Sequence, residues 1–245
     1  MKHKHLILAL ASGLAISGGA QATLIDRGSG LIYDDVLNLT WLQDANYAKT
    51  SGYDADGKMN WANANAWAAN LSYYDSVRGV TYDDWRLPTM TDTDNLGCNY
   101  AYSGTDCAYN VQTVSGSTVY SEMAYMYYVN LGLKGYYSTT GSYQPDFGIF
   151  GNGTQGGQND VGLINNLQSF VYWSGLEYAP SANGAWYFNA VYGYQNAGNE
   201  VNEIYAWAVR PGDVAAAPSG NVPEPATLML LGLGMGVLGL ARRRG

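Results

Sequence analysis

Residues 84–89 read Asp84-Trp85-Arg86-Leu87-Pro88-Thr89, and they predict a junction between a strand and a helix. The ring of Pro88 forces the residue before it into an extended conformation, because a helical conformation there would clash with the proline. Beyond the proline, Thr89 or Thr91 can cap a short helix that carries aspartates in its first turn, within Asp92-Thr93-Asp94.

Upstream of this junction, the sequence predicts two strands and one helix. Residues 30–35 and 39–42 are rich in β-forming residues and are bounded by Gly, Asp and Asn. Asn60 can cap a helix in which apolar residues recur at spacings of three and four. These apolar residues are Trp61, Ala64, Trp67, Ala68 and Leu71. Core packing accounts for both tryptophans.

Downstream, a second helix is predicted over residues 121–131, with Met123, Tyr127 and Leu131 on one face and Gly132 at its end. Residues 135–162 show no sustained period and predict a long surface loop. Strands are then expected over residues 170–174, 185–191 and 204–209. The pattern predicts one α+β domain over residues 23–213 with short antiparallel strands, two or three helices and long loops, followed by a linker over residues 214–221.

The order of these motifs resembles the DUF1566 family and is similar to the C-terminal domain of a Legionella collagen-like adhesin. Its most specific pieces are Trp85-Arg86-Leu87-Pro88-Thr89 and Ala208-Val209-Arg210-Pro211-Gly212, and it also covers residues 31–46 and 172–174. The resemblance implies a C-type-lectin-like fold, distantly related to the formylglycine-generating sulfatase modifiers. For the adhesin, it implies a role in attachment to sulfated glycans.

The N-terminus resembles a secretory signal peptide over residues 1–22. A basic stub is followed by an apolar run from Leu6 to Ile16 and by Ala20-Gln21-Ala22, the small-x-small pattern that signal peptidase cuts. Cleavage between Ala22 and Thr23 is expected. The apolar run is about half of the roughly 20 residues that a membrane anchor needs.

The C-terminus, residues 222–245, carries Pro223-Glu224-Pro225, an uncharged stretch over residues 226–241 and then Arg242, Arg243 and Arg244. The stretch reaches about 24 Å as a helix, enough to span a thin bilayer, with the arginines on the cytoplasmic side. These residues resemble the PEP-CTERM sorting signal. The resemblance implies an exosortase-type protease as partner, a transient membrane anchor, and a final location at the cell surface or in the extracellular matrix. A plain anchor is the alternative.

Residues 23–221 hold 19 acidic side chains against 7 basic ones, a net charge of −12. Such a surface repels nucleic acid and anionic lipid, and it does not suit a sulfated or otherwise strongly anionic glycan unless a local basic patch or bound cations intervene. Both histidines, His3 and His5, lie in the signal peptide, so the mature chain cannot use histidine-dependent catalysis. Cys98 and Cys107, in an oxidising compartment, predict a local disulfide; a reactive or metal-binding thiol pair is the alternative.

Paired carboxylates occur at Asp54 and Asp56, at Asp83 and Asp84, and at Asp92 and Asp94. Such pairs can bind Ca²⁺ or divide acid and base roles in glycoside cleavage, but turn formation and capping also account for each of them. No cofactor is required, and Ca²⁺ binding stays open with no position singled out.

The sequence therefore favours a non-enzymatic module that binds glycan or exopolysaccharide. Aromatic faces pack on the apolar faces of pyranose rings, and the candidate contact residues are Tyr172, Trp173, Glu177, Trp186 and Asn189. A carboxylate-based polysaccharide hydrolase and a structural matrix component without a specific ligand are the two alternatives.

Overall fold

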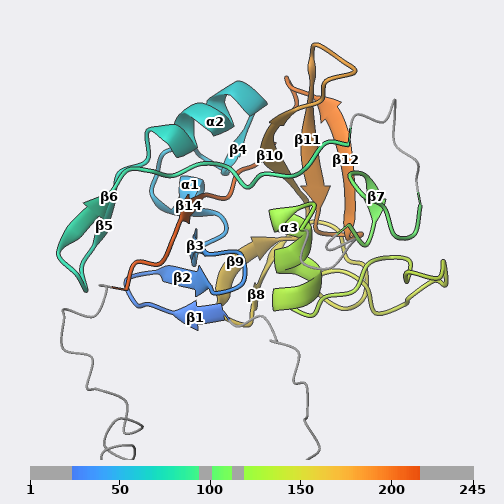
Figure 1. Cartoon of the computed structure of the whole chain (residues 1–245), viewed down its shortest axis with the longest axis horizontal. Coiled ribbons are helices and arrows are strands. Elements are labelled where there is room, and N and C mark those ends of the chain that lie inside the picture. The colour runs from blue at the N-terminus through green and yellow to red at the C-terminus, as the bar shows by residue number, and fades with distance from the viewer. Residues whose placement is uncertain (1–23, 94–100, 112–118, 216–245) are drawn as a thin grey trace, which may run out of the picture.

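The computed structural model describes residues 24–93, 101–111 and 119–215, and Figure 1 shows their arrangement. One sheet joins the two ends of the described chain. It holds β1 (Leu24–Asp26), β2 (Leu31–Asp34), β3 (Leu39–Leu42) and β14 (Val209–Pro211), in the order β1-β2-β3-β14. The predicted strands over residues 30–35 and 39–42 are confirmed as the antiparallel pair β2 and β3. All of β3 is buried.

The two edges of this sheet are linked by side chains. Arg27, just after β1, pairs with Asp213, just after β14, and its Nε donates to Asp213 Oδ1 over 2.9 Å. Thr40 Oγ1 in β3 donates to the carbonyl of Gly212 over 2.7 Å. The end of the domain is therefore held to its beginning.

A second sheet has six strands in the order β4-β13-β10-β11-β12-β7. These are β4 (Lys58–Met59), β13 (Ile204–Tyr205), β10 (Val171–Glu177), β11 (Gly184–Asn189), β12 (Tyr194–Asn199) and β7 (Ala108–Tyr109). The expectation of antiparallel strands is wrong for one pair in this sheet: β10 and β13 are parallel, whereas the other pairs are antiparallel. The strands expected over residues 170–174 and 185–191 are confirmed as β10 and β11.

The prediction of a single strand over residues 204–209 is wrong in one respect, because these residues belong to two strands in different sheets. Ile204 and Tyr205 form β13 in the six-stranded sheet, whereas Val209 begins β14 in the four-stranded sheet. Residues 206–208 are buried and cross from one sheet to the other. A continuous run of β-forming residues does not show where such a crossing occurs.

Two hairpins complete the strands: β5 (Tyr73–Asp75) with β6 (Val80–Tyr82), and β8 (Gln158–Val161) with β9 (Ile164–Gln168). The loop expected over residues 135–162 is irregular as far as residue 157, but its last part is β8. That strand reads Gln-Asn-Asp-Val and is almost wholly exposed, so it lacks the apolar alternation that marks a strand in a sequence.

Both long predicted helices are present. Asn60 caps α2 (Trp61–Ala69) by accepting from the amide of Asn63, and Figure 1 shows α2 beside β4. Ser121 caps α3 (Glu122–Tyr125), which continues as a π-helix, η1 (Met126–Asn130), up to Gly132 at φ +61°. A further short helix, α1, covers Tyr47–Thr50.

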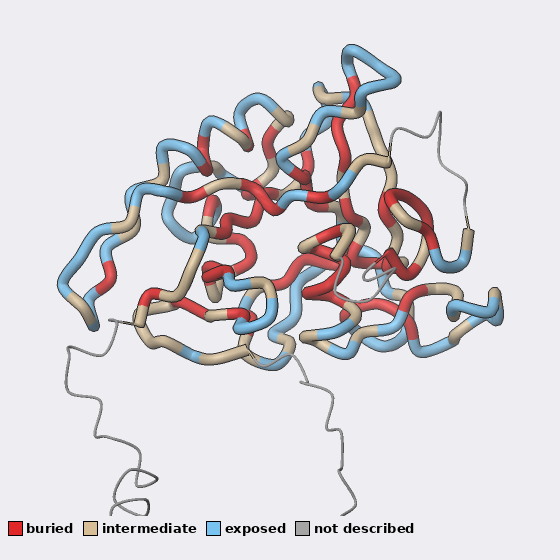
Figure 2. Tube along the Cα trace, in the orientation of Figure 1, coloured by how far each residue is buried: buried red, intermediate tan, exposed pale blue. Residues whose placement is uncertain are grey.

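The core lies between the sheets and the helices, where Figure 2 shows the buried segments. Four of its largest side chains are tryptophans: Trp41, Trp67, Trp173 and Trp207. The rings of Trp41 and Trp207 lie 4.6 Å apart. The core role expected for the α2 tryptophans is confirmed: Trp67 is buried, and Trp61 packs against the core while its Nε1 donates to the carbonyl of Ser174.

The helix predicted to begin at Thr89 or Thr91 is wrong as far as the chain is described, that is, to Thr93; Asp94 lies outside the described residues. Residues 84–93 instead run as an extended connection. The amide of Thr91 donates to the carbonyl of Tyr120, and the amide of Glu122 donates to the carbonyl of Thr89. These pairings with the segment before α3 take up the backbone groups that a new helix would need, so tertiary context overrides the capping signal.

Candidate functional site

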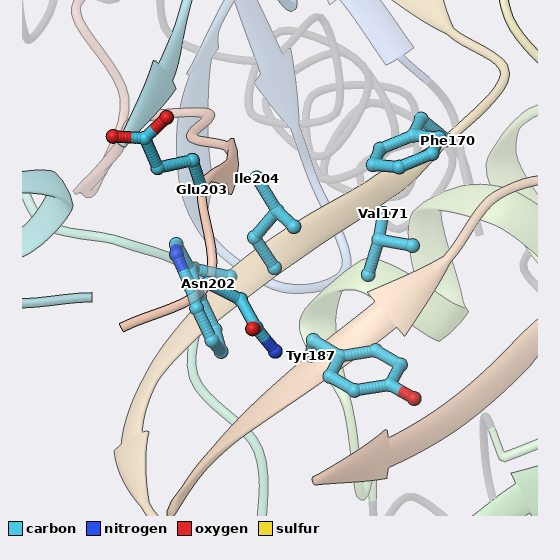
Figure 3. Close-up of a pocket in the computed structure, with 7 residues that line it drawn as sticks. Phe170, Val171, Tyr187, Asn202, Glu203 and Ile204 are labelled. Carbon is cyan, nitrogen blue, oxygen red and sulfur yellow. The ribbon is translucent and has the colours of Figure 1, made fainter. Parts of the chain in front are cut away.

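A pocket of about 380 Å³ opens at the edge between β10, β11 and β13. That volume is within the range of roughly 300–1,000 Å³ that is usual for small-molecule sites. Figure 3 shows Phe170, Val171 and Tyr187 along one side, with Asn202 and Glu203 on the other and Ile204 between them. The lining residues are Phe170, Val171, Trp173, Tyr187, Asn202, Glu203 and Ile204.

The strand pairing of the six-stranded sheet brings these side chains together. Trp173 of β10 is opposite Tyr187 of β11 in the antiparallel register. Tyr172 of β10 pairs with Tyr205 of β13 in the parallel register, which places the turn before β13 next to the start of β10. Trp173 forms the base of the pocket, since its own side chain is buried and its Nε1 donates to the carbonyl of Met59 over 2.9 Å.

The polar side of the pocket is a turn between β12 and β13. The side chain of Asn199 accepts from the amide of Val201 over 3.1 Å, and the amide of Asn202 donates to the carbonyl of Asn199 over 3.0 Å. The side chains of Asn202 and Glu203 are exposed and make no hydrogen bond or ion pair with any described residue. The backbone of this turn is fixed, while its amide and carboxylate stay available to a ligand.

A lysine side chain lies beside the aromatic residues of the pocket. The ammonium of Lys58 is 5.8 Å from the ring centre of Phe170 and 5.5 Å from that of Tyr205. It also pairs with Asp56 over 3.1 Å. The hydrogen bond that Lys58 donates to the Asp56 carboxylate raises the pKa of Lys58, and the charge of Glu203 contributes in the same direction. Lys58 is therefore firmly protonated, and Asp56 neutralises its charge.

The ligand residues expected from the sequence are dispersed in the structure. Only Trp173 belongs to the pocket, and it lies at its base. Tyr172 and Trp186 are also buried, so none of these three rings presents a face to a sugar. Trp186 instead donates from Nε1 to Asp92, and the hydroxyl of Tyr172 accepts from the amide of Gln168.

The other two expected ligand residues lie outside the pocket lining. Asn189 accepts from the amides of Val191 and Tyr192, which gives it a role in the turn after β11. Glu177 is exposed at the end of β10, and its predicted contact with a ligand stays a prediction. The sequence reading missed Phe170, Tyr187, Asn202 and Glu203. One local signal was present, because Asn202 and Glu203 are polar residues in a turn directly before a strand.

Each of the three aspartate pairs has at least one member that contacts another residue of the fold. Asp54 accepts from the amides of Asp56 and Gly57. Asp84 forms a two-pronged pair with Arg210, with distances of 2.7 and 3.0 Å. Within the described ranges, no group of three or more Asp, Glu, Cys or His side chains is arranged to hold a metal ion. The Ca²⁺ expectation stays a prediction without a position.

The motif at residues 84–89 joins three parts of the fold. Trp85 is buried, and Arg86 exchanges backbone hydrogen bonds with Val209 of β14. The Arg86 guanidinium binds both carboxylate oxygens of Glu122, at the start of α3. Residues 84–89 and 208–212, the most specific pieces of the family resemblance, thus contact each other directly.

A family model for the Lcl C-terminal domain matches residues 30–210, from the start of β2 into β14. The chain belongs to the Lcl C-terminal domain family. The matched range includes β2, β3 and the first two residues of β14, as well as the whole pocket lining. No curated protein and no solved structure matches the chain.

A second model, for the PEP-CTERM protein-sorting motif, matches residues 221–244, on the C-terminal side of the Lcl C-terminal domain match that ends at residue 210. This motif indicates an exported cell-surface protein that an exosortase sorts. In the described part of the chain, no helix has the length and apolar character to cross a membrane. The expected span over residues 226–241 lies outside that part, as do both processing sites and Arg242, Arg243 and Arg244.

One of the two cysteines of the predicted disulfide lies among the described residues. Cys107 is buried next to β7 and is disulfide-bonded. Cys98, the partner expected from the sequence, lies outside the described residues.

Proposed function

We propose that this protein is a non-enzymatic glycan-binding module which is exported, processed by an exosortase and retained at the cell surface or in the matrix. We place the binding site in the pocket between β10, β11 and the Asn202–Glu203 turn. The observation that carries this proposal is the combination of one exposed and one partly exposed aromatic ring with an amide and a carboxylate whose side chains make no hydrogen bond or ion pair with the described residues.

The chemistry of the lining suits a saccharide. Aromatic rings pack on the apolar C–H faces of pyranose rings, and here Phe170 is 38% exposed while Tyr187 is partly exposed. The Asn202 amide can both donate to and accept from hydroxyl groups, whereas the Glu203 carboxylate accepts from them. Apolar walls with a few well-placed polar groups are the usual composition of a small-molecule site.

We also propose that the domain has a C-type-lectin-like fold. Membership of the Lcl C-terminal domain family supports this assignment, as does the combination of short strands with long irregular segments such as residues 135–157.

The test uses the protein purified after export, with Phe170→Ala and Tyr187→Ala introduced together. We expect the wild type to be retained by the producer's own polysaccharide or by members of a glycan panel, and the double variant to lose at least tenfold in affinity. Tyr74→Ala is the matched control, because Tyr74 lies on β5, is 63% exposed and does not line the pocket. No retention of the wild type on any glycan would contradict the proposal and favour a structural matrix component.

A hydrolase acting on the same polysaccharide is less well supported. Glycoside cleavage ordinarily uses two carboxyl groups flanking the scissile bond, and Glu203 is the single carboxylate in the pocket lining. Release of reducing ends by the wild type, abolished by Glu203→Gln, would replace the binding proposal with a hydrolytic one.

A further inference from the structure

The cations of the mature body are almost all neutralised within the fold. Its seven basic side chains all lie in the described residues, and six of them form ion pairs with carboxylates. The paired residues are Arg27, Lys58, Arg78, Arg86, Lys134 and Arg210. Lys49, exposed at the end of α1, is the exception among the described basic residues.

Binding of a sulfated or carboxylated glycan requires cations that can contact the ligand, usually several of them together. Here each paired cation would first have to leave its own carboxylate, and one lysine is too little to form a basic patch. Residues 23–221 hold 19 acidic side chains and only 7 basic ones, and this excess of negative charge further opposes an anionic ligand. The charge pattern therefore points to a ligand that is neutral or positively charged.

The pocket lining favours a positively charged ligand over a neutral one. Its carboxylate, Glu203, has no ion pair in the described structure, and Figure 3 shows this carboxylate at the end of the pocket away from Phe170. Aromatic faces attract ammonium groups as well as C–H groups. The position of Lys58 over Phe170 and Tyr205 shows that ring faces at this edge of the sheet accept an ammonium. Aromatic rings together with an unpaired carboxylate suit a cation.

We propose that the pocket selects an amino sugar with a free, protonated amine within a polysaccharide chain, and that Glu203 is the residue that determines this specificity. The inference rests on the proposed glycan-binding function and deepens it. The apolar face of the sugar packs against Phe170 and Tyr187, hydroxyl groups hydrogen-bond to the Asn202 amide, and the ammonium pairs with the Glu203 carboxylate. N-acetylation removes the positive charge and with it the ion pair.

The experiment compares three probes on the protein purified after export: glucosamine oligomers, fully N-acetylated oligomers of the same length, and oligomers of a uronic acid. We expect the glucosamine oligomer to bind about tenfold more tightly than the acetylated one, and the uronic acid oligomer not to bind. Glu203→Gln should abolish the preference for the free amine. Added salt should weaken binding to the glucosamine oligomer and leave binding to the acetylated oligomer nearly unchanged.

Glu177→Gln is the matched control, because it removes an equal charge from an exposed carboxylate of β10 outside the pocket lining. If this control reduced binding as much as Glu203→Gln, the effect would come from overall charge and the inference would be overturned. Equal binding of the amine and acetylated oligomers would also overturn it, while leaving the proposed glycan-binding function intact. Absence of binding to every glycan, including the producer's polysaccharide, would contradict the proposed function itself.

Discussion

Arg86 and Glu122 form a two-pronged ion pair, with Nη1–Oε2 and Nη2–Oε1 distances of 2.7 and 2.8 Å. Glu122 also accepts from the amide of Thr89 over 2.7 Å. One carboxylate therefore fixes the extended segment at residues 84–89 against the first turn of α3, where a negative charge also favours the helix.

Replacing Glu122 with alanine is expected to destabilise the fold by about 2 kcal/mol, because it leaves a half-buried guanidinium and a backbone amide without their acceptor. The denaturation midpoint in urea measures this loss. Asp146→Ala is the control, since it breaks the pair with Lys134, in which both side chains are 52% exposed, and it should lower the midpoint much less than Glu122→Ala does. Equal losses in the two variants would refute a special role for Glu122.

Gly57→Ala is expected to destabilise the domain by about 2 kcal/mol or more. The residue has φ +84°, and an added Cβ would meet the buried Oδ1 of Asn46 at 1.9 Å. Gly52→Ala separates the two causes, because Gly52 has φ +76° but nothing within 4 Å of its Cβ position. That control should show only the conformational cost, about 1 kcal/mol. Thermal unfolding of both variants checks the difference.

Asp34 should give the stability a distinctive pH dependence. Its side chain is fully buried on β2, where desolvation raises its pKa, although the amides of Leu37 and Val36 and the side chain of Asn130 donate to it. A carboxyl group whose pKa is raised on folding favours the folded state most when protonated. Its contribution is present below the ordinary value of 3.8 and is lost as pH rises through the raised folded pKa.

Asp34→Asn removes this titration while keeping an oxygen acceptor for the two backbone amides. The variant should therefore gain stability relative to the wild type as pH rises through that interval, measured by urea unfolding at a series of pH values. A difference that is constant with pH would show that Asp34 does not titrate in the way its burial implies.

The mature protein should contain no free thiol. Alkylation without reduction should leave the mass of the protein unchanged. Peptide mapping should show that Cys98 is bonded to Cys107, because Cys107 is disulfide-bonded in the structure. Reduction should lower the free energy of unfolding by about 2–3 kcal/mol, the contribution usual for so short a loop. Two alkylated thiols in the unreduced protein would contradict this pairing.

Processing at the tail can be read from the intact mass of the surface-exposed protein. We expect it to begin at Thr23 and to lack residues 226–245, because residues 221–244 match the sorting motif and we predict exosortase cleavage near Pro223-Glu224-Pro225. Detection of the full tail on the surface protein would make this segment an ordinary membrane anchor.

Local patterns predicted much of the fold. The β2–β3 pair, α2 with its Asn60 cap and the helix after Ser121 each follow from residues close in sequence. The π-helical continuation after Tyr125 did not follow, because the apolar spacing of residues 123, 127 and 131 suits an ordinary helix as well. The helix expected after Pro88 failed because its backbone groups pair with residues 120–122, about thirty positions away.

The pocket could not be predicted for a related reason. Phe170, Tyr187 and Asn202 come together through the parallel pairing of β13 with β10 and the register of β10 with β11, both of which are set by the tertiary fold. Aromatic residues looked alike in the sequence, whereas burial divides them: Tyr172 is enclosed, and its neighbour Phe170 is exposed. These two residues are two positions apart, so strand alternation alone would put both on one face. The tertiary packing, which encloses only Tyr172, separates them.

The ion pair between Arg27 and Asp213 has a mechanical consequence. A pull on the C-terminal end would reach the domain at this ion pair and at β14, which is held to β3 by three residue pairs. The Asn202–Glu203 turn and the start of β10 belong to the other sheet. Tension on a tethered tail would thus be borne first by the four-stranded sheet, before it reached the sheet that holds the proposed ligand pocket.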